Sequence, residues 1–309
     1  MSAEQVVIHA AGYQVPASVH NRAMRVIEAE LAARVGDRVR FEFTDSVLDL
    51  GKTAGDLFKM VESGELTLCY QSTTRLAQRI PEFGMLDLPF VFRERQDAYA
   101  VLEGPFGDFL RDRIESTSVF RILGWWDNGY RHLTNRARTI RTPEDCAGLT
   151  IRTQFSETAQ QAFRLMGFEP VAIDIRDLPA ALEAGTVDAQ DNALTNIYNF
   201  EIYRKHPYIT LSGHAFGTSV VLANADRLAA LDEDVREALT DAVRIATETQ
   251  HGFAAAEDAT IIERLAGTDA EVTTLTAGQH EAFVDAVSPL IDADRERFGA
   301  DLFAQATGR

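Results

Sequence analysis

Positive charge is scarce in this chain of 309 residues. Lysine and arginine together number 30, against 47 aspartates and glutamates, which gives a formal net charge of −17 at pH 7. The lysines are only Lys52, Lys59 and Lys205. Because binding to nucleic acid or to an anionic membrane surface depends on a surplus of basic side chains, this composition argues against both kinds of partner.

Cysteine and long apolar runs are also scarce. Cys69 and Cys146 are too few for a disulfide scaffold or a cysteine-rich zinc site, and we expect two unconnected thiols. Arg, Asp or Gly interrupts the most apolar windows within about ten residues, so we expect no direct membrane insertion. The first five residues lack the basic and apolar segments of a secretory signal, and we expect either a cytoplasmic chain or one whose signal has been removed.

Sequence signatures of common enzyme classes are missing. The chain has no Gly-x-Ser-x-Gly motif, no phosphate-binding loop ending in Lys-Ser or Lys-Thr, and no His-Glu-x-x-His. His206 and His214 flank a strand-like run, which is a weak pattern for a shared metal. Asp188 and Asp191 follow Gly185, and we interpret them as turn residues that make local hydrogen bonds. The sequence therefore predicts no catalytic residue, no metal ligand and no cofactor.

Strand-like and helix-like segments alternate from the N-terminus. The strand-like runs are 6–11, 39–43 and 66–70, and helix-like stretches begin after Ser18 and at Thr53. This alternation predicts an α/β fold with mainly parallel sheets. Ligands of such sheets bind beyond the carboxyl ends of the strands, which places the loops after Gly12 and from Gln71 at the expected ligand edge.

A second series of the same kind follows residue 142 and predicts a second α/β lobe. Near the C-terminus, residues from about 231 to 266 form one long helical pattern, which at 1.5 Å per residue would extend roughly 50 Å and could brace both lobes. The expected division is a first lobe of 1–125 plus about 213–245, a second lobe of 126–212, and C-terminal helices at 267–309 that pack on the lobes.

Two arginines are unusual in their surroundings. Arg152 interrupts the strand-like run 149–153, and Arg131 follows a strand that ends at Trp126. A buried guanidinium needs a carboxylate partner, from the protein itself or from a ligand. The pattern alone fits a structural salt bridge and an anion-binding site equally well.

Several motifs, in order along nearly the whole chain, resemble a known family. The central ones are 148–152 (Gly-Leu-Thr-Ile-Arg), 170–173 (Pro-Val-Ala-Ile) and 181–192 (Ala-Leu-Glu-Ala-Gly-Thr-Val-Asp-Ala-Gln-Asp-Asn), supported by 81–90, 129–131 and 208–210 ahead of His214. Together they resemble the solute-binding proteins of TRAP (tripartite ATP-independent periplasmic) transporters, of the DctP type. Asp191 and Ala193 depart from the Glu and Pro that are common in the family pattern.

The resemblance implies a two-lobe periplasmic binding protein with a long helix spanning both lobes, which closes on an organic acid. It also implies a periplasmic location, with the signal peptide removed, and delivery of the acid to the permease subunits of a sodium-coupled TRAP transporter. In the family, the arginine matching Arg152 pairs with the ligand carboxylate, and those matching Arg131 and Asn192 assist. We expect a monomer that is not an enzyme.

Selectivity for the rest of the ligand is expected to come from other side chains at the strand ends. These candidates are Tyr13, Gln14, Gln71, Trp126 and Ile173. The alternative hypothesis is an enzyme, a lyase or transferase acting on organic acids on the same two-lobe scaffold. A binding protein is stabilised by its ligand and leaves it unchanged, whereas an enzyme converts it.

Overall fold

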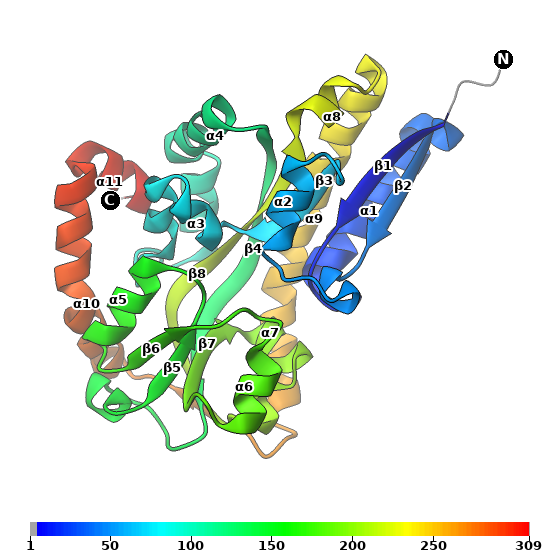
Figure 1. The fold of residues 1–309 in the computed structure, drawn as a ribbon. Coiled ribbons are helices and arrows are strands. Elements are labelled where there is room, and N and C mark those ends of the chain that lie inside the picture. Colours follow the sequence, from blue (N-terminus) through cyan, green and yellow to red (C-terminus); the bar gives the residue numbers. More distant parts are fainter. Residues whose placement is uncertain (1–4, 309) are drawn as a thin grey trace. The chain divides into compact units, whose positions relative to one another are not determined.

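The computed structural model describes residues 5–308, which form two compact units. Unit 1 comprises residues 5–72, 109–127 and 219–255, and unit 2 comprises residues 73–108, 128–218 and 256–308. Three long elements contain residues of both units: β4 (Phe120–Asn135), β8 (Tyr208–Asn224) and helix α9 (Glu233–Leu265), all drawn in Figure 1. The predicted two-lobe α/β architecture with a long shared helix is confirmed.

Unit 1 has a sheet with the strand order β2-β1-β3-β8. Strand β1 is parallel to β2 and β3, and β3 is antiparallel to the last part of β8. The elements of this unit, besides its share of β4, β8 and α9, are β1 (Val6–Ala11), α1 (Val19–Val35), β2 (Val39–Thr44), α2 (Asp56–Glu62), β3 (Leu68–Ser72), most of α4 (Pro105–Thr117) and α8 (Ala225–Ala229).

Helix α1 begins after Ser18, as the sequence predicts. The Ser18 side chain accepts a hydrogen bond from the backbone N–H of Asn21, which satisfies one of the free donors of the first turn. Gly36 ends the helix with a φ of 56°, a conformation that favours glycine. Between these caps, Met24, Ile27 and Leu31 recur at helical spacing and are buried, each contributing about 1.5–3 kcal/mol by leaving water.

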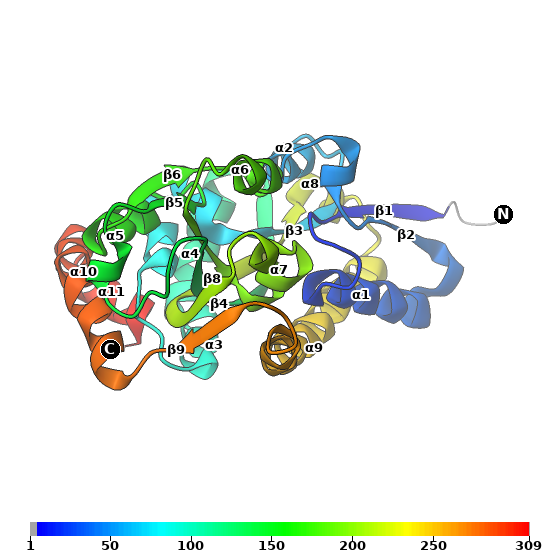
Figure 2. The same cartoon turned by 90° about the horizontal axis from the view of Figure 1, so that it is seen from below.

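Unit 2 has the strand order β4-β7-β5-β6, with β5 parallel to β6 and β7, and β4 antiparallel to β7. Strand β9 (Glu271–Thr274) runs parallel to the start of β8, as Figure 2 shows. The remaining elements are α3 (Arg95–Leu102), β5 (Thr150–Thr153), α5 (Glu157–Leu165), β6 (Glu169–Ala172), α6 (Leu178–Ala184), β7 (Ala189–Ala193), α7 (Leu194–Asn199), α10 (Ala277–Phe298) and α11 (Ala300–Thr307).

The two units differ from the predicted division in one large segment. Residues 73–108, which we expected in the first lobe, belong to unit 2. The reason is hydrogen bonding over long sequence separations: the Ser156 hydroxyl donates to Asp87 at 2.8 Å, and the Thr74 hydroxyl donates to Gln154 at 2.7 Å. Such contacts leave no trace in local sequence patterns.

Both cysteines are buried free thiols, which confirms the expectation that they are unconnected. Burial raises the pKa of Cys69 and of Cys146. Within residues 5–308, no helix has both the length and the apolar character needed to cross a membrane. Residues 1–4, on which the expectation about a signal partly rests, lie outside the described residues.

Candidate functional site

Arg152 is a buried cation without an ion pair. It lies on β5, and its side chain is among the most enclosed polar groups of unit 2, with the residue 2% exposed. Its Nε donates to the carbonyl oxygen of Ile173 at 2.8 Å, whereas Nη1 is buried with no hydrogen-bond partner. Since buried donors are nearly always satisfied, this nitrogen is suited to an acceptor that the protein does not supply.

The electrostatic surroundings of Arg152 explain its lowered pKa of about 10. Burial is the main cause, because it disfavours the charged guanidinium. Asp191 and Asp174 act in the opposite direction, while Arg131 and Arg75 add to the lowering. Arg152 therefore stays protonated at neutral pH and carries its charge at a cost in free energy.

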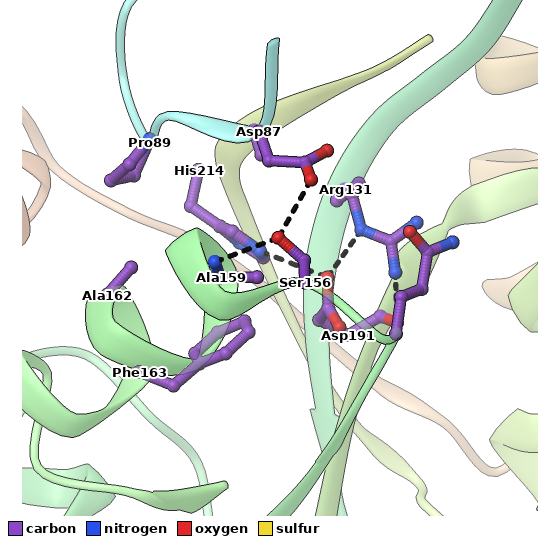
Figure 3. Close-up of a pocket in the computed structure, with 11 residues that line it drawn as sticks. Asp87, Pro89, Arg131, Ser156, Ala159, Ala162, Phe163, Asp191 and His214 are labelled. Atoms are coloured by element: carbon purple, nitrogen blue, oxygen red, sulfur yellow. Dashed lines mark hydrogen bonds and ion pairs between the residues drawn. The ribbon is translucent and has the colours of Figure 1, made fainter. Parts of the chain in front are cut away.

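Arg131, the second arginine, is in a salt bridge. Its Nε donates to the Asp191 carboxylate and its Nη2 donates to the Asp191 carbonyl oxygen at 2.7 Å, while His214 Nε2 lies 3.4 Å from the same carboxylate (Figure 3). Burial alone would raise the pKa of Asp191, but the charge of Arg131 and the hydrogen bonds from His214 and Arg131 hold it well below its usual range. The sequence left open whether Arg131 forms a structural salt bridge or an anion-binding site, and the structure shows the salt bridge.

Strand pairing separates the predicted ligands of unit 2. Arg152 is paired with Gln190, and Asn192 lies two residues further along β7, so these three residues share one face of the sheet. Arg131 is paired with Ala193 and therefore shares the opposite face with Asp191. Arg152 and Asn192 are thus brought to a common face, which Arg131 does not share.

The Asn192 amide has donor capacity to spare. Its Oδ1 accepts from the Asn196 side chain at 2.9 Å, but its Nδ2 makes only a long contact of 3.4 Å to Gln190. Ile173, predicted as a wall of the site, contributes instead through its carbonyl oxygen, which fixes the orientation of the Arg152 guanidinium. Contact of the Ile173 side chain with a ligand stays a prediction.

A small cavity of about 20 Å³ lies beside Arg131 and Asp191 and has the volume of one water molecule. Asp87 and His214 also line it, together with Ser156, the N-cap of α5 (Figure 3). Burial raises the pKa of Asp87 to about 6. The hydrogen bonds from Ser156 and Thr74 and the charge of Arg131 lower this pKa, but they only partly offset the effect of burial. Sequence reasoning missed Asp87, although an acid inside the apolar run 81–92 was a usable signal.

A larger hollow of about 670 Å³ opens on another part of unit 2. Aromatic and apolar side chains such as Phe90, Phe92 and Ile262 line it together with His132 and His280. None of the eight predicted ligand-binding residues lines this hollow. The buried Arg152 therefore carries the candidate site in unit 2.

In unit 1, the loop after β1 is held by Tyr70. The Tyr70 hydroxyl accepts from the backbone N–H groups of Tyr13 and Gln14, at 3.2 and 3.1 Å, and donates to Asn21 at 2.7 Å. Gly12 permits this arrangement, since a Cβ there would lie 2.2 Å from the Tyr70 ring. The loop that the sequence placed at the ligand edge is therefore fixed by buried hydrogen bonds.

Two buried polar side chains in or next to this loop have no hydrogen-bond partner. Both atoms of the Gln14 amide and both ring nitrogens of His20 lack a hydrogen bond. The His20 ring stacks on Tyr70, with centroids 5.0 Å apart. Burial lowers the pKa of His20 to about 3, so the ring is neutral at physiological pH. Gln14 was predicted from the sequence, whereas His20 was missed because it looked like part of an apolar helix face.

Gln71 and Trp126 are also predicted ligand-binding residues of unit 1. The polar groups of both side chains already form hydrogen bonds within the protein. The Gln71 amide donates to the carbonyl oxygen of Ala54 and accepts from the backbone N–H of Ser72. The Trp126 indole N–H donates to the Thr247 hydroxyl at 3.0 Å. For both residues, and for Tyr13, ligand contact stays a prediction.

Asp188 lies at a bend after Gly185, but the predicted local hydrogen bonds of Asp188 and Asp191 were wrong, because the partners of both side chains are distant in the sequence. Asp188 accepts from Arg136 at 2.7 Å and from the backbone N–H of Thr150 at 3.0 Å, while Asp191 lies within β7 and pairs with Arg131. They form two separate ion pairs because their partners come from β4 and from the loop after it. In the part of the chain that the structure describes, no cluster of three or more His, Cys, Asp or Glu side chains could hold a metal ion.

Neutral buried histidines make stability depend on pH. The pKa of His20 in the folded protein, about 3, lies below its unfolded value of 6.5, so the unfolded chain takes up the proton first and stability falls as the pH drops below 6.5. His20→Phe keeps a stacked ring and should reduce the loss of unfolding free energy between pH 7 and pH 5 by about 2 kcal/mol. Urea unfolding at the two pH values measures this.

The matched control for this change is His280→Phe at an exposed position. It should leave the loss between pH 7 and pH 5 as large as in the parent protein. An equal loss in His20→Phe and in the parent would show that His20 can take up a proton in the folded state.

Comparison with known proteins decides the family. Residues 14–297 match the family model described as bacterial extracellular solute-binding protein, family 7 (DctP). The chain belongs to this family. Family 7 proteins are solute-binding proteins and not enzymes, so the enzyme alternative has no support.

This family 7 chain is similar to the following three proteins. It is 31% identical over 89% of its length to the uncharacterized protein y4mM of Sinorhizobium fredii, of which it spans only half. It is 28% identical to the 2,3-diketo-L-gulonate-binding periplasmic protein YiaO of Escherichia coli, covering 79% of this chain and 73% of that one. A TRAP periplasmic solute-binding protein from Polaromonas sp. JS666, solved with D-erythronate, matches with a TM-score of 0.91, 25% identity and 98% coverage of both chains.

Proposed function

We propose that this protein captures a small organic acid outside the cytoplasm, in the periplasm, and delivers it to the permease subunits of a sodium-coupled TRAP transporter. The observation that carries the proposal is the buried Arg152 guanidinium, which has an unpartnered Nη1 and no ion pair. A ligand carboxylate would supply the missing negative charge and acceptor. Support also comes from the family and from the organic acids named for the relatives from Escherichia coli and Polaromonas.

Arg152 is the proposed carboxylate ligand, and Asn192, on the same face of the sheet, is proposed to donate to a second oxygen. Each charge-assisted hydrogen bond of this kind contributes about 1.5–3 kcal/mol. Arg131 is proposed to act mainly through Asp191, which it holds ionised near Arg152.

A thermal-shift screen of organic acids on refolded, ligand-free protein tests the proposal. The cognate acid should raise the unfolding temperature with the logarithm of its concentration, corresponding to about 2.7 kcal/mol at 100 times its dissociation constant. Nuclear magnetic resonance of the same samples should show the acid unchanged. A screen without any stabilising acid, or conversion of the acid to a product, would contradict the proposal.

The transport step requires a separate measurement. Proteoliposomes that contain a TRAP permease able to accept this binding protein should accumulate the acid only when the binding protein and an inward sodium gradient are both present. Equal uptake with a potassium gradient would contradict sodium coupling. Uptake without the binding protein would contradict its role in delivery.

A further inference from the structure

The four charged side chains around Arg152 form two ion pairs with each other, and Arg152 has no partner among them. The four groups that act most strongly on it are Asp191 and Arg131, which pair with each other, and Asp174 and Arg75, which do the same. Each pair is close to neutral as a unit. Arg152 itself is left with one uncompensated positive charge.

Buried cations are rare elsewhere in the described chain. Among residues 5–308, Arg131 and Arg152 are the only buried arginines or lysines. The carboxylate Asp87, which lines the cavity beside Arg131, adds negative charge to these surroundings when it is ionised. Within the described residues, a second anionic group would therefore meet no second buried cation that lacks an ion pair, and leaving a buried charge unpaired costs several kcal/mol.

A second donor on the face of Arg152 is uncharged. Asn192 lies on the same face of the sheet, and its Nδ2 makes only a long contact of 3.4 Å to Gln190. An amide donor suits a hydroxyl or carbonyl substituent of the acid and supplies no charge for a second carboxylate.

We infer that the acid bound by this protein carries a single carboxylate, and that its other polar groups are uncharged hydrogen-bonding groups such as hydroxyls. This inference rests on the function proposed above. The carboxylate neutralises Arg152 and accepts from its unpartnered Nη1, and an uncharged group of the acid accepts from the Asn192 amide. Monocarboxylic hydroxy acids fit this description, and dicarboxylates do not.

Matched pairs of acids test the inference directly. Calorimetry at pH 7.5 compares D-erythronate with meso-tartrate, D-galactonate with galactarate, and succinamate with succinate. The members of each pair have the same carbon chain and differ only in whether the far end is neutral or a second carboxylate. In every pair that binds, the monoacid should bind at least about 30-fold more tightly.

The outcomes separate this inference from the proposed function. A diacid that binds as tightly as its monoacid partner, or more tightly, overturns the inference and leaves organic-acid binding intact. If no acid of the three pairs binds and the wider screen also finds none, the proposed function fails and the inference fails with it.

A charge substitution provides the second test. Asp174→Asn keeps an acceptor for the backbone N–H of Arg176 but releases Arg75, which adds a positive charge near Arg152. The preference for the monoacid over its diacid partner should fall at least about 10-fold, since a second carboxylate then has a cation to neutralise. The matched control is Asp177→Asn, which breaks the exposed pair with Arg176 and should leave the preference unchanged.

If Asp174→Asn folds poorly, removing the positive partner of the same ion pair provides the test. Arg75→Gln leaves the Asp174 carboxylate free to offset the charge of Arg152, so the affinity for the monoacid should fall at least about 10-fold. Unchanged affinity in Arg75→Gln, or an unchanged preference in Asp174→Asn, would show that these ion pairs do not set the charge of the ligand.

Discussion

Replacing Arg152 with lysine should weaken binding of the cognate acid by about 30- to 1000-fold, and replacing it with alanine should abolish binding. The guanidinium Nε is held by the Ile173 carbonyl at 2.8 Å, which orients the terminal nitrogens for a carboxylate. Lysine keeps the charge but offers a point donor without this fixed geometry. Calorimetry with the acid found by thermal shift measures the loss.

The matched control is Arg136→Lys. Arg136 also pairs with a carboxylate, Asp188, but this pair is half exposed and has no proposed role in binding. Its affinity for the acid should stay within twofold of the parent protein. An Arg152→Lys variant within threefold of the parent would contradict the proposal that the fixed geometry of the Arg152 guanidinium is needed to bind the carboxylate.

The second large effect is expected on stability. Asp191→Ala removes the carboxylate that pairs with buried Arg131 and contacts His214, and should lower the free energy of unfolding by about 3–5 kcal/mol. The cost arises because a buried guanidinium loses its counterion. Urea unfolding of the ligand-free protein measures it.

Two further variants separate this cause from a general loss of packing. Removing both charges in an Asp191→Ala, Arg131→Met double variant should recover most of the lost stability, because an apolar side chain then replaces the cation. Glu183→Ala, which breaks the exposed pair with Lys205, should cost less than about 1 kcal/mol. A loss below about 1 kcal/mol in Asp191→Ala would mean that the ion pair contributes little.

The local elements of this fold could be predicted because their signals are local. Ser18 and Gly36 bound α1 through their own backbone and side-chain chemistry, and the repeating apolar positions of α9 need no distant partner to be recognised. The assignment of residues 73–108 to a lobe could not be predicted in this way. It depends on hydrogen bonds such as that between Ser156 and Asp87, which are 69 residues apart.

The same limit applies to the site. The sequence singled out Arg131 and Arg152 as cations in apolar surroundings but could not distinguish a salt bridge from an anion site. The difference is made by Asp191, 60 residues from Arg131, and by the direction in which β7 presents it. His20 escaped notice because a histidine in an apolar helix face shows its missing partners only once Tyr70 is stacked against it.

The two buried free thiols have a practical consequence for measuring ligand capture. A thiol whose pKa is raised by burial is a poor nucleophile, so Cys69 and Cys146 should resist maleimide labelling in the folded protein. A single cysteine introduced on the surface could then carry a fluorescent or spin label without removal of the native ones. Because no disulfide has to re-form, denaturant can also strip a co-purified acid, and the protein can be refolded under reducing conditions.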